Sequence, residues 1–482
     1  MNASASAWRT VSVSRRAKTL EARWQKLCAA YLPRASTNSI WRLSTDSRSR
    51  RAGWKLHISA TILSAPRVLK RVAPFLTAQD VLFKAPRSLR EIGELNSGLN
   101  YRYSQVGKII TIYPKNDDQA IFLAQRLHAL TKRFSGPNIP FDLKFAESGN
   151  VYYRYGAFEY VEVTHNGRQV PALPSPAGDL IPDDRQRSQP DWVVADPFQP
   201  YKPPARCAAP LPMHIIRVLV QRGKGGVYVA LDLSSGTPRL CLLKQGRKNG
   251  ETSWDGRDGA WRVRNEKRVM FQLSSRGVPV PRVYSSFELE GNYYLVMEYL
   301  NGDTLHGKLL SRSRRLSVAQ VVVYGLQLAQ FICKLHRAGW VWRDCKPGNI
   351  IVTSSGRLVP IDFEGAAPIG KPDPVRWGTP GFIMPRARRG NINSKADDLY
   401  AFGSILFLLL TGRIYDRQEQ RTVQRLRRNV PGRLIELVDS LLSTEADERL
   451  TIEAAYASLR SILKSLKLRK MKYPAAPAAQ PL

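Results

Sequence analysis

Residues 53–63, GWKLHISATIL, alternate between apolar and polar positions. Because successive side chains of a strand point to opposite faces, the pattern predicts a strand with Lys55, His57 and Ser59 on one face. The opposite face is apolar, and we expect it to be buried. The polar face has two interpretations, a solvated surface or a pair of catalytic groups, and this stretch alone does not separate them.

Three further patterns predict that the first 165 residues form a mixed domain of helices and strands. Residues 107–114, GKIITIYP, predict a strand of β-branched residues that proline stops. Residues 117–134, DDQAIFLAQRLHALTKRF, have the apolar period of a helix. Residues 150–163, NVYYRYGAFEYVEV, predict another strand, rich in aromatic side chains.

The rest of the chain changes character twice. Residues 171–212 contain 11 of the 32 prolines, which predicts an irregular connection. A strand-rich block starts near Met213, and a helix-rich block occupies about residues 316–466. The longest apolar run, AFGSILFLLLTG at 401–412, is too short to cross a bilayer, so it predicts a buried core helix and no membrane span.

The 482 residues, 43% of them hydrophobic, are enough for two or three domains of roughly 100–200 residues. We therefore expect an α+β protein with two domains. The first domain covers residues 1–165, a Pro-rich connection covers 166–212, the second domain covers 213–465, and 466–482 form a disordered tail.

The net charge is +35, from 74 Lys and Arg against 39 Asp and Glu. Such a field attracts nucleic acid, anionic lipid, acidic peptides or phosphorylated substrates. No RNA-binding or helix-turn-helix pattern accompanies the charge, so we expect no specific nucleic-acid partner. The five cysteines are scattered and never form CxxC, which indicates a reducing, cytoplasmic compartment.

The helix-rich block contains four stretches in a fixed order, LHRAGWVWRDCKPGNIIV, PIDFEGA, GTPGFIMP and KADDLYAFGSILFLLLTG. In order and spacing they resemble the motifs of protein kinases, and the resemblance covers about residues 213–465. It implies a bilobal kinase-like fold that uses ATP and magnesium to transfer a phosphoryl group. Lys346, two residues after Asp344, and the GTPGF segment favour a peptide or protein substrate over a small molecule.

The resemblance implies a role for each residue of these motifs. Asp344 would be the catalytic base, Lys346 would face the γ-phosphate, and Asn349 and Asp362 would hold magnesium. Asp398 would brace the catalytic loop. For ATP binding, the resemblance assigns Lys244 with its partner Glu266, the glycine loop with Gly223, Gly225 and Gly226, and the hinge around Glu298.

Several positions depart from the kinase pattern. The glycines of RGKGGVYVA lack the usual GxGxxG spacing, Trp342 replaces a histidine, and Glu364 replaces a glycine. Arg386 stands where a glutamate normally pairs with a late arginine, here Arg449. These changes leave a catalytically silent pseudokinase as an alternative.

GWKLHISA, GKIITIYP and VYYRYGAF, followed by DWVVADPF and a kinase, resemble the front end of class III and class IV lanthipeptide synthetases. The resemblance covers about residues 50–465. In that family a phosphoSer/Thr lyase-like domain of mixed α/β structure precedes a kinase and a cyclase. The kinase phosphorylates Ser or Thr of a precursor peptide, and the lyase eliminates the phosphate to leave dehydroalanine or dehydrobutyrine.

The resemblance assigns the K-x-H pair of the opening strand to elimination, with Lys55 as the base and His57 as the acid. A lysine acts as a base near neutral pH only if its pKa is depressed, which neighbouring cations achieve. Lys84, Lys108 and Arg154 are the candidates for a cage of cations around the substrate phosphate, and a guanidinium such as that of Arg154 binds phosphate oxygens in a fork.

Family cyclases bind zinc through cysteines and a histidine, and after His336 this sequence offers only Cys345. We therefore expect ring closure, where it occurs, to be spontaneous or to need a separate cyclase. The sequence predicts a cytoplasmic dehydratase that phosphorylates a precursor peptide with ATP and then eliminates phosphate. The alternatives are a signalling Ser/Thr kinase whose N-terminal domain binds phosphopeptides without cleaving them, and a basic nucleic-acid-binding protein.

Overall fold

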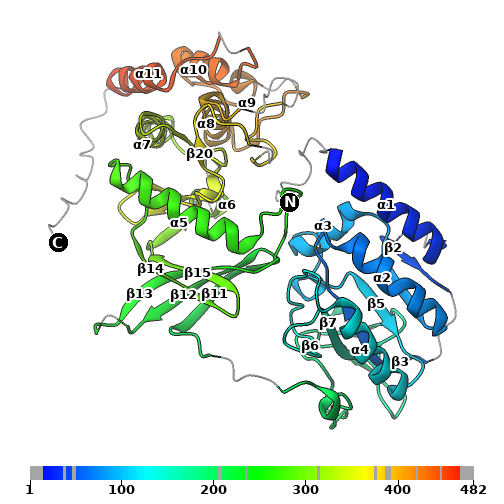
Figure 1. The fold of residues 1–482 in the computed structure, drawn as a ribbon. Coiled ribbons are helices and arrows are strands. Elements are labelled where there is room, and N and C mark those ends of the chain that lie inside the picture. The colour runs from blue at the N-terminus through cyan, green and yellow to red at the C-terminus, as the bar shows by residue number, and fades with distance from the viewer. Residues whose placement is uncertain are drawn as a thin grey trace.

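The computed structural model describes residues 15–35, 39–45, 50–204, 209–234, 236–311, 315–373, 377–385, 392–419, 422–445 and 448–466. Residues 467–482 of the predicted disordered tail lie outside this set, as do Arg386 and Cys207. The described residues form an N-terminal domain beside a bilobal kinase fold (Figure 1). The predicted α+β class is confirmed.

The N-terminal domain is built on one antiparallel sheet of seven strands in the order β1-β2-β4-β5-β3-β7-β6. The strands are β1 (Arg34–Ala35), β2 (Trp41–Leu43), β3 (Ala52–Ile58), β4 (Leu82–Pro86), β5 (Ile110–Tyr113), β6 (Leu143–Lys144) and β7 (Val151–Ala157). The helices are α1 (Arg15–Tyr31), α2 (Ala65–Ala78), α3 (Leu89–Ser97) and α4 (Asp117–Thr131), with a 3-10 turn η2 at Tyr103–Gln105.

The alternation of β3 places its apolar side chains in the core of this domain. Trp54, Leu56 and Ile58 are buried in one cluster with side chains of α1, α2 and α4. Figure 1 shows these three helices lying together along the outer side of the sheet. Helix α4 starts where predicted, because the side chain of Asn116 accepts a hydrogen bond from the backbone N–H of Gln119 and caps the helix.

The segment after β7 is more ordered than the sequence predicted. A second, three-stranded sheet has the order β10-β9-β8, with β8 (Glu162–His165), β9 (Arg168–Pro174) and β10 (Leu180–Pro182). The prediction of an irregular connection over residues 171–212 is therefore wrong for β9 and β10. Pro174 and Pro182 stand at the ends of these two strands, where a missing N–H costs least, whereas Pro171 lies within β9 opposite Glu162 of β8. A short 3-10 turn, η3 (Gln199–Tyr201), follows.

The small lobe of the kinase fold consists of a five-stranded antiparallel sheet and helix α5 (Gly259–Ser275). Its strand order is β11-β12-β13-β15-β14. The strands are β11 (His214–Arg222), β12 (Gly225–Asp232), β13 (Arg239–Gly246), β14 (Val283–Leu289) and β15 (Asn292–Glu298). Figure 1 shows α5 lying across this sheet, and buried side chains of α5 and β15 belong to the same core.

The large lobe is helical, as predicted for residues 316–466. Its helices are α6 (Leu305–Leu310), α7 (Val318–Arg337), α8 (Lys395–Thr411), α9 (Val423–Leu426), α10 (Gly432–Leu442) and α11 (Ile452–Ser465). Short strands carry the catalytic loops: β16 (Gly302–Thr304), β17 (Trp340–Val341), β18 (Ile350–Thr353), β19 (Leu358–Pro360), β20 (Ala367–Pro368) and the turn η4 (Pro347–Asn349).

The predicted core helix at residues 401–412 is confirmed, since almost every side chain of α8 is buried. Among the described residues, α7 alone is long and apolar enough to cross a membrane by length and composition. More than half of its apolar window, 56%, is buried inside the fold, as is usual for a core helix.

The two domains meet at the loop after β13 and at the glycine loop between β11 and β12. The guanidinium of Arg247 donates to the hydroxyl of Tyr103 at 3.0 Å and to the backbone carbonyl of Asn138 at 2.9 Å. The backbone N–H of Gly223 donates to the carbonyl of Ser97, at the end of α3, at 2.9 Å. Arg247 is buried at this contact, so its charge depends on these two hydrogen bonds.

We expect Arg247→Ala to weaken the coupling between the domains. Loss of a charged hydrogen-bond donor from a buried contact costs about 1.5–3 kcal/mol of unfolding free energy. In scanning calorimetry the variant should unfold at a lower temperature, with the two domains resolved as separate transitions. Arg264→Ala is the matched control, because the contacts of Arg264 of α5, an exposed ion pair with Glu288 and the ring of Tyr293, lie within the small lobe. Equal melting curves for the two variants would contradict the assignment.

Candidate active sites

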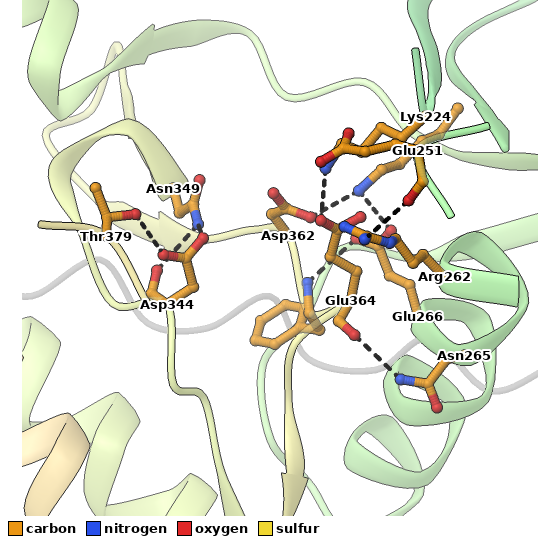
Figure 2. Close-up of polar contacts among 12 residues, drawn as sticks. Lys224, Glu251, Arg262, Asn265, Glu266, Asp344, Asn349, Asp362, Glu364 and Thr379 are labelled. Carbon is orange, nitrogen blue, oxygen red and sulfur yellow. Dashed lines mark hydrogen bonds and ion pairs between the residues drawn. The ribbon is translucent and has the colours of Figure 1, made fainter. Parts of the chain in front are cut away.

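Three polar side chains surround Asp344 in the catalytic loop of the kinase fold. The hydroxyl of Thr379 donates to one carboxylate oxygen of Asp344 at 2.8 Å, and the ammonium of Lys346 lies 2.8 Å from the other. The amide of Asn349 donates to the Asp344 backbone carbonyl and side chain, each at 3.0 Å (Figure 2). Asp344 is thereby held with both oxygens hydrogen-bonded at the mouth of the loop.

The second cluster of the kinase fold is centred on Lys244 of β13. Its ammonium lies 2.6 Å from Glu266 of α5 and 2.7 Å from Asp362. Burial alone would lower the pKa of Lys244, but Asp362 and Glu266 raise it well above its ordinary value. Burial opposes ionisation of Asp362 as well, yet Lys244 and Lys224 keep the pKa of this carboxyl below its ordinary value. The structure therefore brings together the three residues that the sequence assigned to nucleotide phosphates and metal.

Trp342, which replaces the usual histidine, is fully buried and joins the catalytic loop to the segment of Asp362 and Phe363. Its indole N–H donates to the backbone carbonyl of Asp362 at 3.2 Å, and its ring stacks on Phe363 at 5.8 Å between centroids. The carboxylate of Asp398 accepts the backbone N–H groups of Trp342 and Arg343 at 2.9 and 2.8 Å. Asp398 thus braces the catalytic loop by hydrogen bonds to its backbone.

Glu364, which replaces a glycine, pairs with Lys224 of the glycine loop at 2.5 Å, and Figure 2 shows both beside Asp362. Burial opposes ionisation of Glu364, but Lys224 lowers the pKa of its carboxyl. A small cavity under the glycine loop is lined by Lys224, Gly225, Gly226, Lys244 and Glu364. Two of the three glycines assigned to ATP binding therefore line the cavity next to Lys244.

Gly223 and Glu298 have other contacts than the sequence suggested. A side chain at Gly223 would clash with the backbone carbonyl of Asn96, so this glycine permits the approach of the N-terminal domain. The carboxylate of Glu298 accepts the backbone N–H of Arg282 at 3.0 Å, so its side chain supports the hinge from β14.

The activation segment is tied to the catalytic loop by a carboxylate. Asp373 accepts from Arg343 at 3.0 Å and from Arg257, near the start of α5, at 3.2 Å. Arg449, whose usual glutamate partner is replaced by Arg386, instead donates to the backbone carbonyl of Ser443 at 3.1 Å. Arg386 itself lies outside the described residues.

In the N-terminal domain, strand pairing places the predicted lyase residues on one face of the sheet. Lys55 of β3 lies opposite Arg154 of β7, and His57 lies opposite Thr111 of β5. Thr111 in turn lies opposite Lys84 of β4. Because residues paired directly across strands share a face, Lys55, His57, Lys84 and Arg154 point to the side away from the helices.

Lys55 is held among cations. The ammonium groups of Lys55 and Lys84 each lie 5.7 Å from the ring centre of Tyr113. The ammonium of Lys84 also lies 4.5 Å from the ring centre of Trp41. Burial, together with Lys84 and Arg154, lowers the pKa of Lys55 well below its ordinary value. The direction is the one that a catalytic base requires.

His57 belongs to a buried chain with Asp142 and Lys108. The Nδ1 atom of His57 lies 2.6 Å from Asp142, whose other oxygen lies 2.8 Å from the ammonium of Lys108. Burial would raise the pKa of Asp142, but Lys108 and His57 lower it to about 2. Burial lowers the pKa of His57 to about 3 although Asp142 opposes the shift. His57 is therefore neutral at pH 7. The ammonium of Lys108 balances the charge of Asp142.

Sequence reasoning missed Asp142, Asp183 and Arg185. Asp142 follows Phe141, which has a φ of 65°, and no periodic pattern marks it. Asp183 pairs with Arg154 at 2.8 Å and lies 3.5 Å from Arg185. These two residues follow β10, in the segment that the sequence assigned to an irregular connection.

Comparison with known families gives two matches along the chain. The RamC N-terminal domain matches residues 26–209, and the protein kinase domain matches residues 219–459. The matches confirm both resemblances and their order, a RamC-type domain followed by a kinase.

Three curated relatives illustrate the range of similarity. A probable SapB synthase of Streptomyces coelicolor is 29% identical over 74% of this chain and 40% of its own length. Serine/threonine-protein kinase F of Synechocystis is 28% identical over 52% of this chain and 54% of its own length. Serine/threonine-protein kinase PknA of Mycobacterium tuberculosis is 32% identical over 41% of this chain and 46% of its own.

This chain thus spans about half or less of the length of each of these relatives. The kinase match covers half of the chain and the RamC match most of the part before it. The chain belongs to the protein kinase family and carries a RamC N-terminal domain in front of its kinase domain.

Proposed function

We propose that this protein is a bifunctional peptide dehydratase of lanthipeptide-type biosynthesis. It phosphorylates Ser or Thr of a precursor peptide with ATP and then eliminates the phosphate to give dehydroalanine or dehydrobutyrine. The observation that carries the proposal is the presence, in one chain, of a kinase catalytic cluster and of a sheet face bearing a depressed-pKa lysine beside a histidine and several cations. The similarity to a probable SapB synthase, which extends beyond the kinase domain, supports it.

In the first reaction, Asp344 accepts the proton of the attacking Ser or Thr hydroxyl. Lys346, held 2.8 Å from Asp344, balances charge on the moving phosphoryl group. Lys244, kept charged by Asp362 and Glu266, binds the α- and β-phosphates of ATP. Each group therefore stabilises negative charge where it develops or moves.

Asn349 and Asp362 supply an amide and a carboxylate oxygen, and oxygen ligands are the ones that Mg²⁺ prefers. Three carboxylates, those of Glu266, Asp362 and Glu364, surround two lysines, an excess of negative charge that suits a divalent cation. Bound there, Mg²⁺ would neutralise charge on the phosphates of ATP.

In the second reaction, neutral Lys55 removes the α-proton of the phosphorylated residue. The Cα–H electrons form the Cα=Cβ double bond, the Cβ–O bond breaks, and its electrons leave with the phosphate. Protonated His57 donates a proton to the departing phosphate oxygen, and Arg154 and Lys84 hold the dianion. Lys55 ends protonated and His57 neutral, so proton exchange with solvent restores the site.

One observation favours the alternative, a kinase with a phosphopeptide-binding domain. With a pKa near 3, His57 carries no acidic proton at neutral pH in the substrate-free protein. Acid catalysis therefore requires that the entering phosphate dianion raise this pKa, since a nearby negative charge favours imidazolium. The two functions differ in whether a phosphopeptide loses its phosphate.

We further propose a cytoplasmic location and, where rings form, a separate cyclase partner. ATP-dependent chemistry supports the location, as do the four described cysteines, which are all free and buried: Cys28, Cys241, Cys333 and Cys345.

The first test is intact-mass spectrometry of a candidate precursor peptide incubated with the protein, ATP and magnesium. We expect the loss of one water per modified residue. Asp344→Asn should reduce all modification about 10²- to 10⁴-fold, because the general base is lost. Asp303→Asn is the matched control, since Asp303 is an exposed carboxylate that pairs with Lys308. Full activity of Asp344→Asn would refute the assigned base.

Lys55→Ala and His57→Ala should each block elimination while leaving phosphorylation intact, so that phosphopeptide accumulates. The expected loss is again about 10²- to 10⁴-fold, the usual contribution of a general acid or base. Lys115→Ala is the control, because Lys115 of the same domain forms an exposed pair with Asp80. A wild-type protein that only adds phosphate would instead support the phosphopeptide-binding alternative.

The pH dependence of elimination tests the cause of the Lys55 shift. In an Asp344→Asn background, elimination from a synthetic phosphoserine peptide should rise with pH as Lys55 loses its proton. Lys84→Ala removes a cation that lowers the pKa of Lys55, so the rising limb should move to higher pH. A rising limb that stays at the same pH would mean that Lys84 does not cause the shift.

A further inference from the structure

The lyase-like site contains a guanidinium and a carboxylate that the reaction above does not use. Asp183 accepts from Arg154 at 2.8 Å, and the Nε atom of Arg185 lies 3.5 Å from its other oxygen. The side chain of Asp183 is 10% exposed and that of Arg154 is 8% exposed, so the pair lies inside the site rather than on the surface. Arg185 reaches this position from the segment after β10.

Both guanidinium groups have unused hydrogen-bonding capacity. The Nε atoms of Arg154 and of Arg185 are buried and have no hydrogen-bond partner among the residues that the structure describes. Buried donors are nearly always paired in folded proteins, so two such donors beside one carboxylate indicate a missing acceptor. A phosphate offers several acceptor oxygens, where a carboxylate offers two.

The charge of the site points the same way. One oxygen of Asp142 contacts His57 and the other contacts Lys108, so this carboxylate does not balance the charge of the other cations. The single charge of Asp183 then faces the remaining cations around Lys55, which are Lys84, Arg154 and Arg185. A phosphate monoester carries about −1.5 to −2 charges at pH 7, which matches this excess better than one carboxylate does.

We propose that Arg185 is a further phosphate-binding residue of the lyase-like site, and that Asp183 occupies the place of the substrate phosphate when no substrate is bound. The proposal deepens the proposed elimination and rests on it for the nature of the ligand, a phosphorylated Ser or Thr side chain. A cavity lined by Arg154, Ile181, Asp183 and Trp192 adjoins the pair. The backbone N–H of Asp183 stays bonded to the carbonyl of Pro171 at 2.7 Å, so rotation of the side chain alone frees Arg154.

Binding of inorganic phosphate to the full-length chain, measured by isothermal titration calorimetry, tests this assignment directly. A non-hydrolysable ATP analogue with magnesium, present in excess, keeps phosphate out of the kinase site. Asp183→Asn should bind phosphate about ten-fold more tightly than the unchanged protein, because the competing charge is gone. Arg185→Ala should bind it about ten- to hundred-fold more weakly, and Arg185→Lys should recover part of the loss.

The matched control is Arg126→Ala. Arg126 of α4 belongs to the same domain but is exposed and lies on the helix-covered side of the sheet, away from the site. It should change phosphate affinity by less than two-fold. Weaker phosphate binding by Asp183→Asn would overturn the proposal, because it would make Asp183 a permanent support for Arg154. Unchanged binding by Arg185→Ala would remove Arg185 from the site.

Elimination from a synthetic phosphoserine peptide separates this inference from the proposed function. If the unchanged protein eliminates phosphate, Arg185→Ala should raise the peptide concentration needed for half-maximal rate. If the phosphate affinities of the variants follow the expected order but no phosphate is eliminated from the peptide, the phosphate site is supported and the lyase activity is refuted. If elimination proceeds and Arg185→Ala changes neither elimination nor phosphate binding, the role of Arg185 is refuted and the lyase activity is supported. Melting temperatures of all variants show that each remains folded.

Discussion

The register of β3 between β5 and β7 is the constraint on which the lyase-like site depends. It sets Lys55 opposite Arg154 and His57 opposite Thr111, so the chemistry of the domain lies on one face of the sheet. A slip of one residue would turn Lys55 and His57 into the apolar core and expose Leu56. Burial of Trp54, Leu56 and Ile58 under α1, α2 and α4 therefore fixes the face on which Lys55 and His57 lie. Core packing and reaction geometry have the same origin here.

The two sites have opposite electrostatic designs. The lyase-like face collects cations in excess of its carboxylates, and burial and mutual repulsion lower the pKa values of Lys55 and Lys108. The kinase site collects carboxylates around Lys244, which is held in its charged form. The first arrangement favours a base and a bound dianion, whereas the second favours a metal-bound nucleotide. In the proposed reaction, a peptide phosphorylated at the kinase site would carry the negative charge that the lyase-like face lacks.

Whether the position of a residue could be predicted from the sequence depends on whether the residue belongs to a local pattern. The alternation in β3 predicted that Lys55 and His57 share a face, and linear motifs singled out Asp344 and Asn349, which are hydrogen-bonded to each other, and Asp362, which pairs with Lys244. Asp142 sits in a loop that no periodicity marks, directly after Phe141 with its φ of 65°, and lies beside His57. Asp183 and Arg185 follow a strand in a proline-rich segment, and only the fold brings them to β7. Long-range register and loop placement come from tertiary packing, which composition does not encode.

The departures from the kinase pattern become consistent once they are located in space. Gly223 is used to let the backbone of Asn96 approach, which leaves Gly225 and Gly226 over the cavity beside Lys244. Lys224, between Gly223 and Gly225, forms an ion pair with Glu364, the residue that replaces a glycine after Asp362 and Phe363. An unusual glycine loop and an unusual metal-binding motif thus compensate each other's charge. Because the same loop donates its Gly223 N–H to Ser97, the N-terminal domain holds the loop that covers the nucleotide site. The arrangement of the two domains is therefore part of the structure of the kinase site itself.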